Sequence, residues 1–152
     1  IKAFGKLYRE NPSVRLYIIG EGLWREYLEE LIEKEKLKGI VHLVGILMKP
    51  FGFLKGCDCF ILSSHYEGQP LVVQEARTLH MPIIISKFAT AKDVLIENGQ
   101  LLIGHEVDDL YEGMKTFIEG SVPDYEFDCE AYNKEVYKEF ERVLQCDGRS
   151  NG

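Results

Sequence analysis

Short apolar runs alternate with amphipathic segments along most of this chain. The apolar runs predict β-strands over residues 14–19, 40–44, 58–62, 83–86 and 101–103. Apolar residues at helical spacing predict helices over residues 1–10, from Leu23 up to Gly39, and over 71–79, 91–96 and 108–118. One further helical turn is expected over 49–54. Strands that alternate with helices are typical of a parallel sheet with crossover helices, so we predict an α/β, Rossmann-like, three-layer αβα domain with a mainly parallel sheet.

The last thirty residues have a separate helical pattern. Asp128 is a candidate N-cap, and six apolar residues after it share one face: Tyr132, Val136, Tyr137, Phe140, Val143 and Leu144. We therefore predict one domain over residues 1–120, a linker and C-terminal helix over 121–146, and a disordered tail over 147–152. The apolar face of the helix is expected to fold back over the surface of the domain.

Composition and charge narrow the range of functions. The chain has 152 residues, of which 45% are hydrophobic and 28% charged, as in an ordinary globular domain. Its net charge of −7 argues against nucleic acid as a partner, since such proteins need clustered Lys and Arg. No apolar run approaches the ~20 residues that span a bilayer, and we expect a cytoplasmic protein. Four cysteines lack metal-ligand spacing, so no metal or other cofactor is expected; Cys57 and Cys59 are predicted to be small buried residues on one face.

The segment after the third predicted strand carries the most chemistry. Ser63 ends the apolar run, a polar turn follows, and Pro70 is suited to the first turn of a helix. Glu67 and Glu75 stand on either side of that helix start. Ligands of open α/β sheets bind at the carboxyl ends of strands, where free N–H groups of a helix start favour a diphosphate. Glu75 is placed to accept hydrogen bonds from two vicinal hydroxyls, so the segment predicts a nucleotide-sugar site.

A second turn, Gly20-Glu21-Gly22, also joins a strand to a helix. A dinucleotide fingerprint would need a third glycine where this chain has Arg25, so a nicotinamide cofactor is not favoured. Two interpretations remain open for the turn: a border of the donor site, or an ordinary connection between a strand and a helix.

Several blocks of this sequence, in order, resemble one enzyme family. The resemblance covers roughly residues 1–120 and rests on the segments 1–4, 16–22, 41–45, 57–64, 67–76 and 81–86. The segment Glu-Gly-x-Pro-x4-Glu-Ala looks like the E-x7-E signature of retaining glycosyltransferases of the GT-B fold. The chain is similar to the C-terminal, donor-binding half of the glycosyltransferase family 4, or group 1, type. The resemblance thus implies one half of a GT-B fold and a hexosyltransferase that acts in polysaccharide biosynthesis.

The resemblance also implies roles for individual residues. Glu67 is implied as the catalytic-site residue that meets hydroxyls of the donor sugar, and Glu75 as the residue that holds the nucleotide ribose. The remaining donor-binding candidates are Gly20, Gly22, Gly68, Gln69, Pro70 and Leu71. The chain departs from the family at His80, where a glycine is common, and after the fourth strand, where Lys87-Phe88-Ala89-Thr90-Ala91 replaces a Gly-Gly turn. The family's basic pair, normally just before the position of Ile1, is absent.

We therefore expect the donor-binding half of a metal-independent enzyme that transfers a sugar to a glycan, lipid or polymer acceptor. Its partners would be a nucleotide-sugar donor and a missing N-terminal acceptor-binding domain, and the full-length protein is compatible with peripheral membrane association. This chain alone is expected to be inactive. Two alternatives stay open: half of a nucleotide-sugar epimerase, or a non-catalytic interaction domain derived from a transferase.

Overall fold

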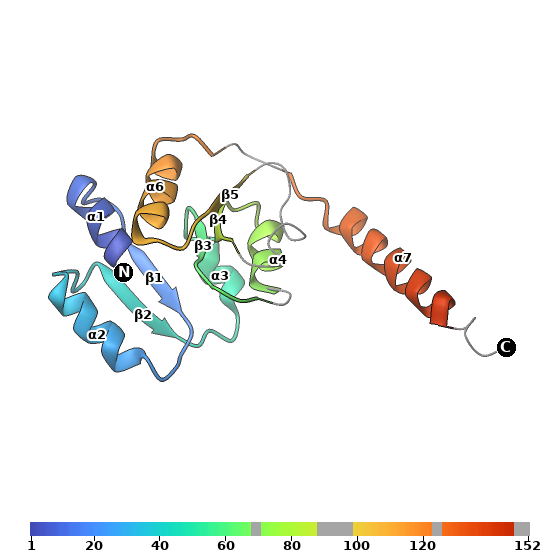
Figure 1. Ribbon diagram of the computed structural model, residues 1–152, viewed down its shortest axis with the longest axis horizontal. Helices are drawn as coiled ribbons and strands as arrows, with labels where there is room; N and C mark the ends of the chain where they lie inside the picture. Colours follow the sequence, from blue (N-terminus) through green and yellow to red (C-terminus); the bar gives the residue numbers. More distant parts are fainter. Residues whose placement is uncertain (68–70, 88–98, 123–125, 148–152) are drawn as a thin grey trace.

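The structure is a computed structural model that describes residues 1–67, 71–87, 99–122 and 126–147 (Figure 1). Its elements, in chain order, are α1 (Lys2–Glu10), β1 (Leu16–Ile19), α2 (Arg25–Lys34), β2 (Val41–Gly45), α3 (Pro50–Leu54), β3 (Phe60–Leu62), α4 (Leu71–Thr78), β4 (Ile83–Ser86), β5 (Gln100–Ile103), α6 (Val107–Ile118) and α7 (Cys129–Asp147). The alternation of strands and helices confirms the predicted α/β class. The helix predicted over residues 91–96 lies outside the described residues, and so does the predicted tail over 147–152 except for Asp147, which is the last residue of α7 rather than part of a disordered tail.

The strands form two parallel groups rather than one continuous sheet. β1 pairs with β2 from Leu16 opposite Val41 onward, with a register shift between Ile18 and Ile19. β4 lies between β3 and β5 and is parallel to both. Among the described strands no ladder joins β1 to β3. The prediction of a mainly parallel sheet is therefore confirmed, but its continuity is not.

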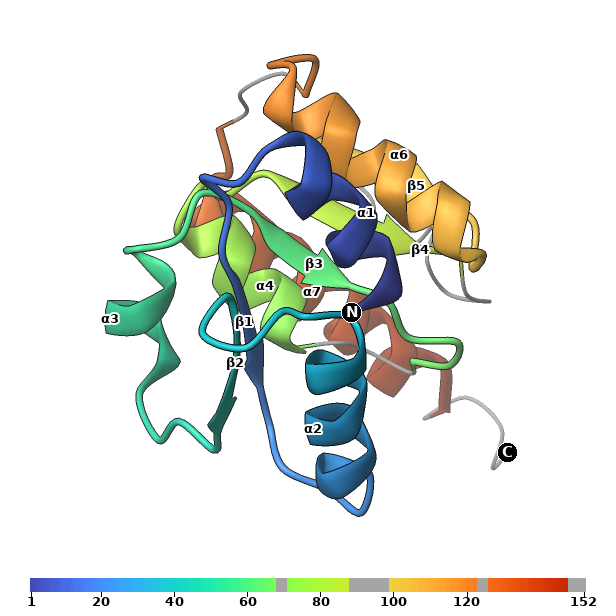
Figure 2. The same cartoon turned by 90° about the vertical axis from the view of Figure 1, so that its left-hand side faces the viewer.

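Two apolar clusters cover the two faces of these strands. The first cluster takes residues from α1, α2 and α6 and from the strands of both groups; its buried members are Ala3, Phe4, Leu7, Ile32, Leu37, Val41, Ile84, Ile103 and Met114. The second cluster lies on the other face, under α3 and α4; its buried members are Leu54, Val73, Ala76, Met81, Ile83 and Ile85. Figure 2 shows α1 and α6 side by side over the sheet. Helices on both faces give the predicted three layers.

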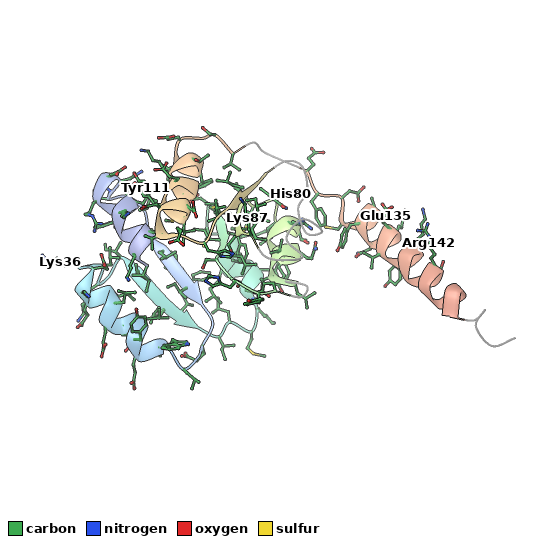
Figure 3. All side chains as sticks on the ribbon, viewed as in Figure 1. Lys36, His80, Lys87, Tyr111, Glu135 and Arg142 are labelled. Carbon is green, nitrogen blue, oxygen red and sulfur yellow. The ribbon has the colours of Figure 1, made fainter. Side chains whose placement is uncertain are left out.

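Polar contacts join α1 to α6 at the rim of the first cluster. Lys6 forms an ion pair with Asp108, and the Tyr111 hydroxyl donates a hydrogen bond to Glu10 Oε1 at 2.7 Å (Figure 3). This hydrogen bond to a carboxylate raises the pKa of Tyr111, because it stabilises the protonated phenol. Both contacts are exposed and contribute little beyond the packing beneath them.

The expectation that Cys57 and Cys59 share a face is wrong. Cys59 packs against the first cluster and Cys57 against the second, because the strand begins only at Phe60 and the chain has not yet adopted the two-residue repeat. Both thiols are partly buried, and burial raises the pKa of Cys59 to about 12. The interpretation as small, unreactive residues fits this environment.

The C-terminal helix forms as predicted but extends away from the body of the domain (Figure 1). Asp128 Oδ1 accepts hydrogen bonds from the backbone N–H groups of Glu130 and Ala131 at 3.0 and 2.9 Å, which confirms it as the cap. Tyr132 contacts α4 through a 3.2 Å hydrogen bond from Gln74 Nε2. Beyond that root, Tyr137 is 70% exposed, so this part of α7 does not fold back over the domain as we expected.

His80, where the resemblance leads one to expect glycine, has φ +54°. This is the left-handed region that glycine enters freely and that costs other residues about 1–2 kcal/mol. His80, in the turn between α4 and β4, therefore has the backbone conformation that a glycine would adopt there. Its ring contacts the linker, where Phe127 N–H donates to His80 Nδ1 at 3.4 Å.

Candidate functional site

The described candidate residues Gly20, Gly22 and Glu67 lie on loops at the carboxyl ends of the strands, and Leu71 and Glu75 lie in α4, which follows β3. In each parallel group the strands end at the same edge, with Gly20–Gly22 after β1, Ser63–Glu67 after β3, Lys87 after β4 and Gly104–Glu106 after β5. Edges of this kind are where open α/β sheets bind ligands. Gly20, Gly22 and Glu67 thus follow strand ends of the kind at which ligands bind, and their roles there stay predictions.

The loop after β3 is tied to the loops of its neighbours. Ser86, buried at the end of β4, donates a hydrogen bond to Ser64 O at 2.6 Å. The His65 and His105 rings stack with centroids 4.4 Å apart, which joins the ends of β3 and β5. Both contacts fix the backbone that leads to Glu67. Neither was visible in the sequence, because each joins residues more than twenty positions apart.

Glu67 and Glu75 lie on either side of the turn from β3 into α4. Glu67 is half-buried at the end of the described part of the loop, and Glu75 is half-buried one turn into α4. Between them, Gly68, Gln69 and Pro70 lie outside the described residues, so those three predictions have no structural outcome. Leu71, the first described residue of α4, is 69% exposed and open to contact with a ligand.

The Gly20–Gly22 turn has the backbone that its glycines predict. Gly20 has φ +128°, and its N–H donates to Gly45 O at 2.8 Å, so the ends of β1 and β2 are held together. A Cβ at Gly22 would meet nothing within 4 Å. At position 20 the positive φ favours glycine. At position 22 the surrounding atoms would leave room for a larger side chain, so packing does not explain the glycine there.

Two basic residues at these loops were missed in the sequence. Arg25 begins α2 and forms ion pairs with Glu21 at 2.7 Å and Glu29 at 3.0 Å, which neutralises the acid inside the glycine turn. Lys87 follows β4, with its backbone N–H bonded to Ile103 O at 2.9 Å and its side chain exposed (Figure 3). The sequence does place Lys87 directly after an apolar strand. A single lysine at a strand end is common, however, so this position alone did not indicate a function.

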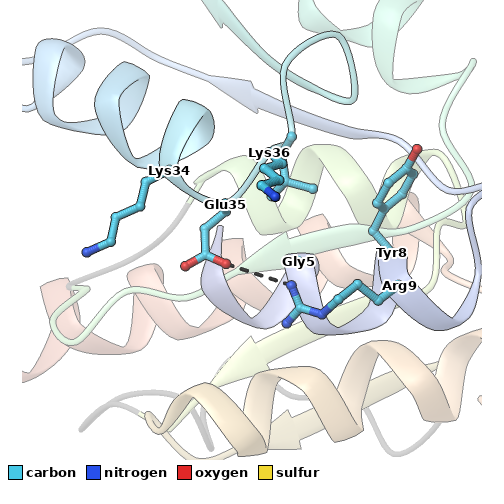
Figure 4. A pocket seen from close by; sticks show the side chains of 7 residues that line it. Gly5, Tyr8, Arg9, Lys34, Glu35 and Lys36 are labelled. Carbon is cyan, nitrogen blue, oxygen red and sulfur yellow. Dashed lines mark ion pairs between the residues drawn. The ribbon is translucent and has the colours of Figure 1, made fainter.

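A hollow of about 450 Å³ lies between α1 and the C-terminal end of α2 (Figure 4). Arg9, Lys34, Glu35 and Lys36 line it, and Arg9 Nη1 lies 3.8 Å from Glu35 Oε2. Arg9 and Lys34 belong to the last turns of α1 and α2, where cations complement the helix dipole. We assign this hollow to the structure of the helix ends rather than to the candidate site.

The described residues contain no group of three or more His, Cys, Asp or Glu side chains placed to hold a metal ion. No helix among them is long and apolar enough to cross a membrane.

Comparison with known families decides the class of the protein. A family described as glycosyl transferases group 1 matches residues 1–136. The chain belongs to this family. It is 36% identical over 114 residues to an uncharacterised glycosyltransferase of Methanocaldococcus jannaschii, a match that covers 74% of this chain and 28% of the relative. It is 26% identical over 133 residues to a poly(ribitol-phosphate) alpha-N-acetylglucosaminyltransferase of Staphylococcus aureus, which covers 86% of this chain and 27% of that protein.

Solved structures give the same fold. The pneumococcal O-GlcNAc transferase GtfA, solved in complex with UDP and GlcNAc, aligns with a TM-score of 0.73 and 18% identity, over 95% of this chain and 31% of that one. TarM aligns with a TM-score of 0.71 and 21% identity, over 78% of this chain and 24% of that one. The group 1 glycosyl transferase chain described here is thus a Rossmann-like domain of the GT-B type. It spans only about 28% and 27% of the two curated relatives it matches.

Proposed function

We propose that this chain is the donor-binding half of a retaining glycosyltransferase that takes a sugar from a nucleotide-sugar. The observation that carries the proposal is the placement of Glu67 and Glu75, two half-buried carboxylates on either side of the turn from β3 into α4. A carboxylate accepts hydrogen bonds from hydroxyls with both oxygens, and bonds of this charged kind contribute about 1.5–3 kcal/mol each. Two such groups near a helix start suit a ligand with hydroxyls on both sides of a diphosphate.

In this proposal Glu75 binds the ribose and Glu67 binds hydroxyls of the donor sugar. Relatives of known structure support a nucleotide-sugar donor, because GtfA was solved with UDP and GlcNAc. A Cβ at Gly22 would meet nothing within 4 Å and Leu71 is 69% exposed, so both leave room for a ligand. Gly68, Gln69 and Pro70 are the remaining candidates between Glu67 and Leu71 in the sequence. The acceptor, a glycan, lipid or polymer, would be bound by a separate N-terminal domain.

A diphosphate leaving group also needs positive charge. Lys87 is the exposed cation that directly follows β4, next to the strand that leads to Glu67. We infer that Lys87 faces the diphosphate when the donor is bound. Lys87→Gln should then weaken nucleoside diphosphate binding more than nucleoside binding, whereas Lys55→Gln, an exposed lysine after α3, should change neither.

The reaction is tested by product analysis of the full-length protein with a panel of nucleotide-sugars and acceptors. We expect acceptor-dependent transfer with retained anomeric configuration, which NMR of the product measures, and no loss of rate in EDTA. Glu67→Ala should lower turnover and leave the affinity for the nucleoside diphosphate nearly unchanged.

Other products would contradict the proposal. Epimerisation of the donor without an acceptor would show that the protein is a nucleotide-sugar epimerase. Donor binding with no product would show that the domain is not catalytic. We also expect residues 1–152 alone to bind nucleotide weakly and transfer nothing, because the acceptor side of the cleft is absent. Sustained transfer by this chain alone would contradict the assignment as half of an enzyme.

A further inference from the structure

The helix that carries Glu75 is held on the sheet mainly by small apolar side chains. Val73 and Ala76 of α4 are 0% exposed and belong to the second cluster. Apolar contacts are not directional, so they hold α4 on the strands but fix its rotation about its own axis less closely than hydrogen bonds do. The direction in which Glu75 projects therefore depends on the polar contacts of the same helix.

A buried arginine supplies polar contacts of this kind. Arg77 of α4 is 2% exposed, although arginine is almost never fully buried in proteins without partners. Its Nη1 donates a hydrogen bond to Gln74 Oε1 at 3.2 Å, and its Nη2 donates one to Gln100 Oε1 at 3.4 Å. Gln100 begins β5, whose four residues all pair with β4. The arginine therefore joins α4 to a fixed point of the sheet.

The other end of the Gln74 amide joins this arginine to α7. Gln74 Nε2 donates a hydrogen bond to the Tyr132 hydroxyl at 3.2 Å, while its Oε1 accepts the bond from Arg77. The Phe127 ring, just before α7, has its centroid 5.7 Å from the guanidinium carbon of Arg77, within the range of a cation–π contact. The Phe127 and Tyr132 rings also contact each other, with centroids 5.5 Å apart. Polar contacts thus connect β5, α4 and the first turn of α7.

Two further contacts hold the start of α7 against the end of α4. Phe127 N–H donates to His80 Nδ1 at 3.4 Å (Figure 3), and Cys129 Sγ lies 3.7 Å from Thr78 Oγ1. His80 makes its contact from the left-handed backbone conformation, which disfavours residues other than glycine. A disfavoured conformation persists where the surrounding structure fixes it, so this end of α4 is held firmly.

Arg77 and Glu75 project from nearly opposite sides of α4. Successive residues of an α-helix are rotated by about 100°, so residues two positions apart point about 160° away from each other. A rotation of the helix at Arg77 would therefore turn Glu75 by the same angle on the other side. Because Arg77 is buried, it would act on a ligand only through the helix.

We propose that Arg77 is a positioning residue for Glu75, held in place by Gln74 and by the first turn of α7. The guanidinium fixes the rotation of α4, and the fixed helix keeps the Glu75 carboxylate where two ribose hydroxyls can reach it. Placement matters here because a hydrogen bond weakens steeply as its angle departs from linear. This role of Arg77 rests on the proposed function, in which Glu75 binds the ribose.

Nucleotide titration of the full-length Arg77→Met variant separates positioning from stability. Methionine keeps much of the volume and removes the charge, a change that often leaves stability unaffected at buried sites. With whichever of UDP, GDP, ADP and CDP the native protein binds most tightly, we expect about tenfold weaker binding. The urea midpoint and the affinity for the 2′,3′-dideoxy form of the same nucleotide should stay close to the native values.

Two arginine variants serve as controls. Arg77→Lys keeps the charge but not the planar fork of donors, so it should recover part of the lost affinity. Arg15→Met, at an exposed arginine before β1, should change neither affinity.

A milder pair of variants tests the contact with α7, and decides the matter if Arg77→Met does not fold. Tyr132→Phe removes the hydroxyl that Gln74 binds and should weaken binding of the ribose form alone, by about threefold. Tyr137→Phe is the matched control further along α7, where the side chain is 70% exposed, and should change nothing. Equal behaviour of the two tyrosine variants would overturn the role given to α7.

A double-mutant cycle shows whether Arg77 acts through Glu75. In a Glu75→Gln background, Arg77→Met should cause no further loss of ribose preference, and an additive loss would overturn the proposal. An unchanged ribose preference in a stable Arg77→Met variant, or equal weakening of the ribose and dideoxy forms, would also overturn it while leaving Glu75 as the ribose ligand. A native protein without ribose preference would instead overturn the role of Glu75, and that of Arg77 with it.

Discussion

The β1–β2 pair and the β3–β4–β5 group are built from similar apolar sequences but differ in burial. β4 has a strand on each side and a helix layer on each face, and all four of its residues are buried. Among the described strands β1 has one neighbour, and its residues alternate between half-buried and exposed, with Ile19 38% exposed. Position in the sheet, rather than composition, therefore sets how much each isoleucine contributes to stability.

The same contrast applies to the glycines of the two groups. Gly113 of α6 packs against β4 and β5, and a Cβ there would lie 2.8 Å from Ile103 Cγ2 and 3.3 Å from Ile84 Cγ2. Gly22, after β1, has nothing within 4 Å of a Cβ. Packing against β4 and β5 therefore explains the glycine at position 113. Packing does not explain the glycine at position 22. The first two of the three predictions that follow test these differences, and the expected effects of the three decrease in order.

Ile84→Ala should destabilise the protein by about 2–5 kcal/mol, because it leaves a cavity under α1 and α6. Ile19→Ala is the matched control and should cost under about 1 kcal/mol, since that side chain is partly in water already. Urea unfolding of both variants measures the difference. Equal losses would show that the two strand groups are equally buried, in conflict with the comparison.

Gly113→Ala should cost up to about 2 kcal/mol. Overpacking against Ile103 and Ile84 costs about 1–3 kcal/mol, and the better helix propensity of alanine offsets about 1 kcal/mol of that. Gly22→Ala should leave the free energy of unfolding within about 0.5 kcal/mol of the native value. If the Gly22 turn borders the donor, this stable variant should nevertheless bind nucleoside diphosphate more weakly. A large loss of stability in Gly22→Ala would show a packing role instead.

Cys59 should make the protein less stable in alkali. Its pKa is raised to about 12 by burial, so the thiol stays protonated in the fold and ionises more easily when the chain unfolds. The stabilisation that this raised pKa gives is complete below pH ~9 and is lost progressively as the pH rises toward 12. At pH 10 the free energy of unfolding should be lower by about 1.4 kcal/mol. Unfolding at pH 8 and pH 10 should show this loss in the native protein and not in Cys59→Ala. The same pH dependence in both would rule out the burial of this thiol.

Most of the helices and strands were predictable because their signals are local. Apolar periodicity predicted most described elements to within a few residues, although α2 ends at Lys34 and not at Gly39 as expected. Asp128 was recognisable as a cap from its own side chain and position. The interruption between β1 and β3 was not predictable, because pairing depends on which strands meet in space. The direction of α7 was missed for a similar reason. An apolar face on a helix does not show which surface the helix packs against.

The site was predictable to a smaller degree. The positions of Glu67 after a strand and of Glu75 in the next helix follow from sequence spacing, and the structure has Glu67 after β3 and Glu75 in α4. The Ser86 hydrogen bond and the His65–His105 stack were not predictable, because they join separate loops. The ligand roles of the two glutamates remain predictions.

The central claim is that Glu75 recognises the ribose of a nucleotide donor. Calorimetric titration of the full-length protein with nucleoside diphosphates and their 2′,3′-dideoxy forms tests it directly. The native protein should prefer the ribose form by about 10–100-fold, as expected for about 1.5–3 kcal/mol from hydrogen bonds to a charged group. Glu75→Gln should lose most of this preference, while Glu30→Gln, an exposed acid on α2, should keep it. An equal preference for ribose in the native protein and Glu75→Gln would contradict the account.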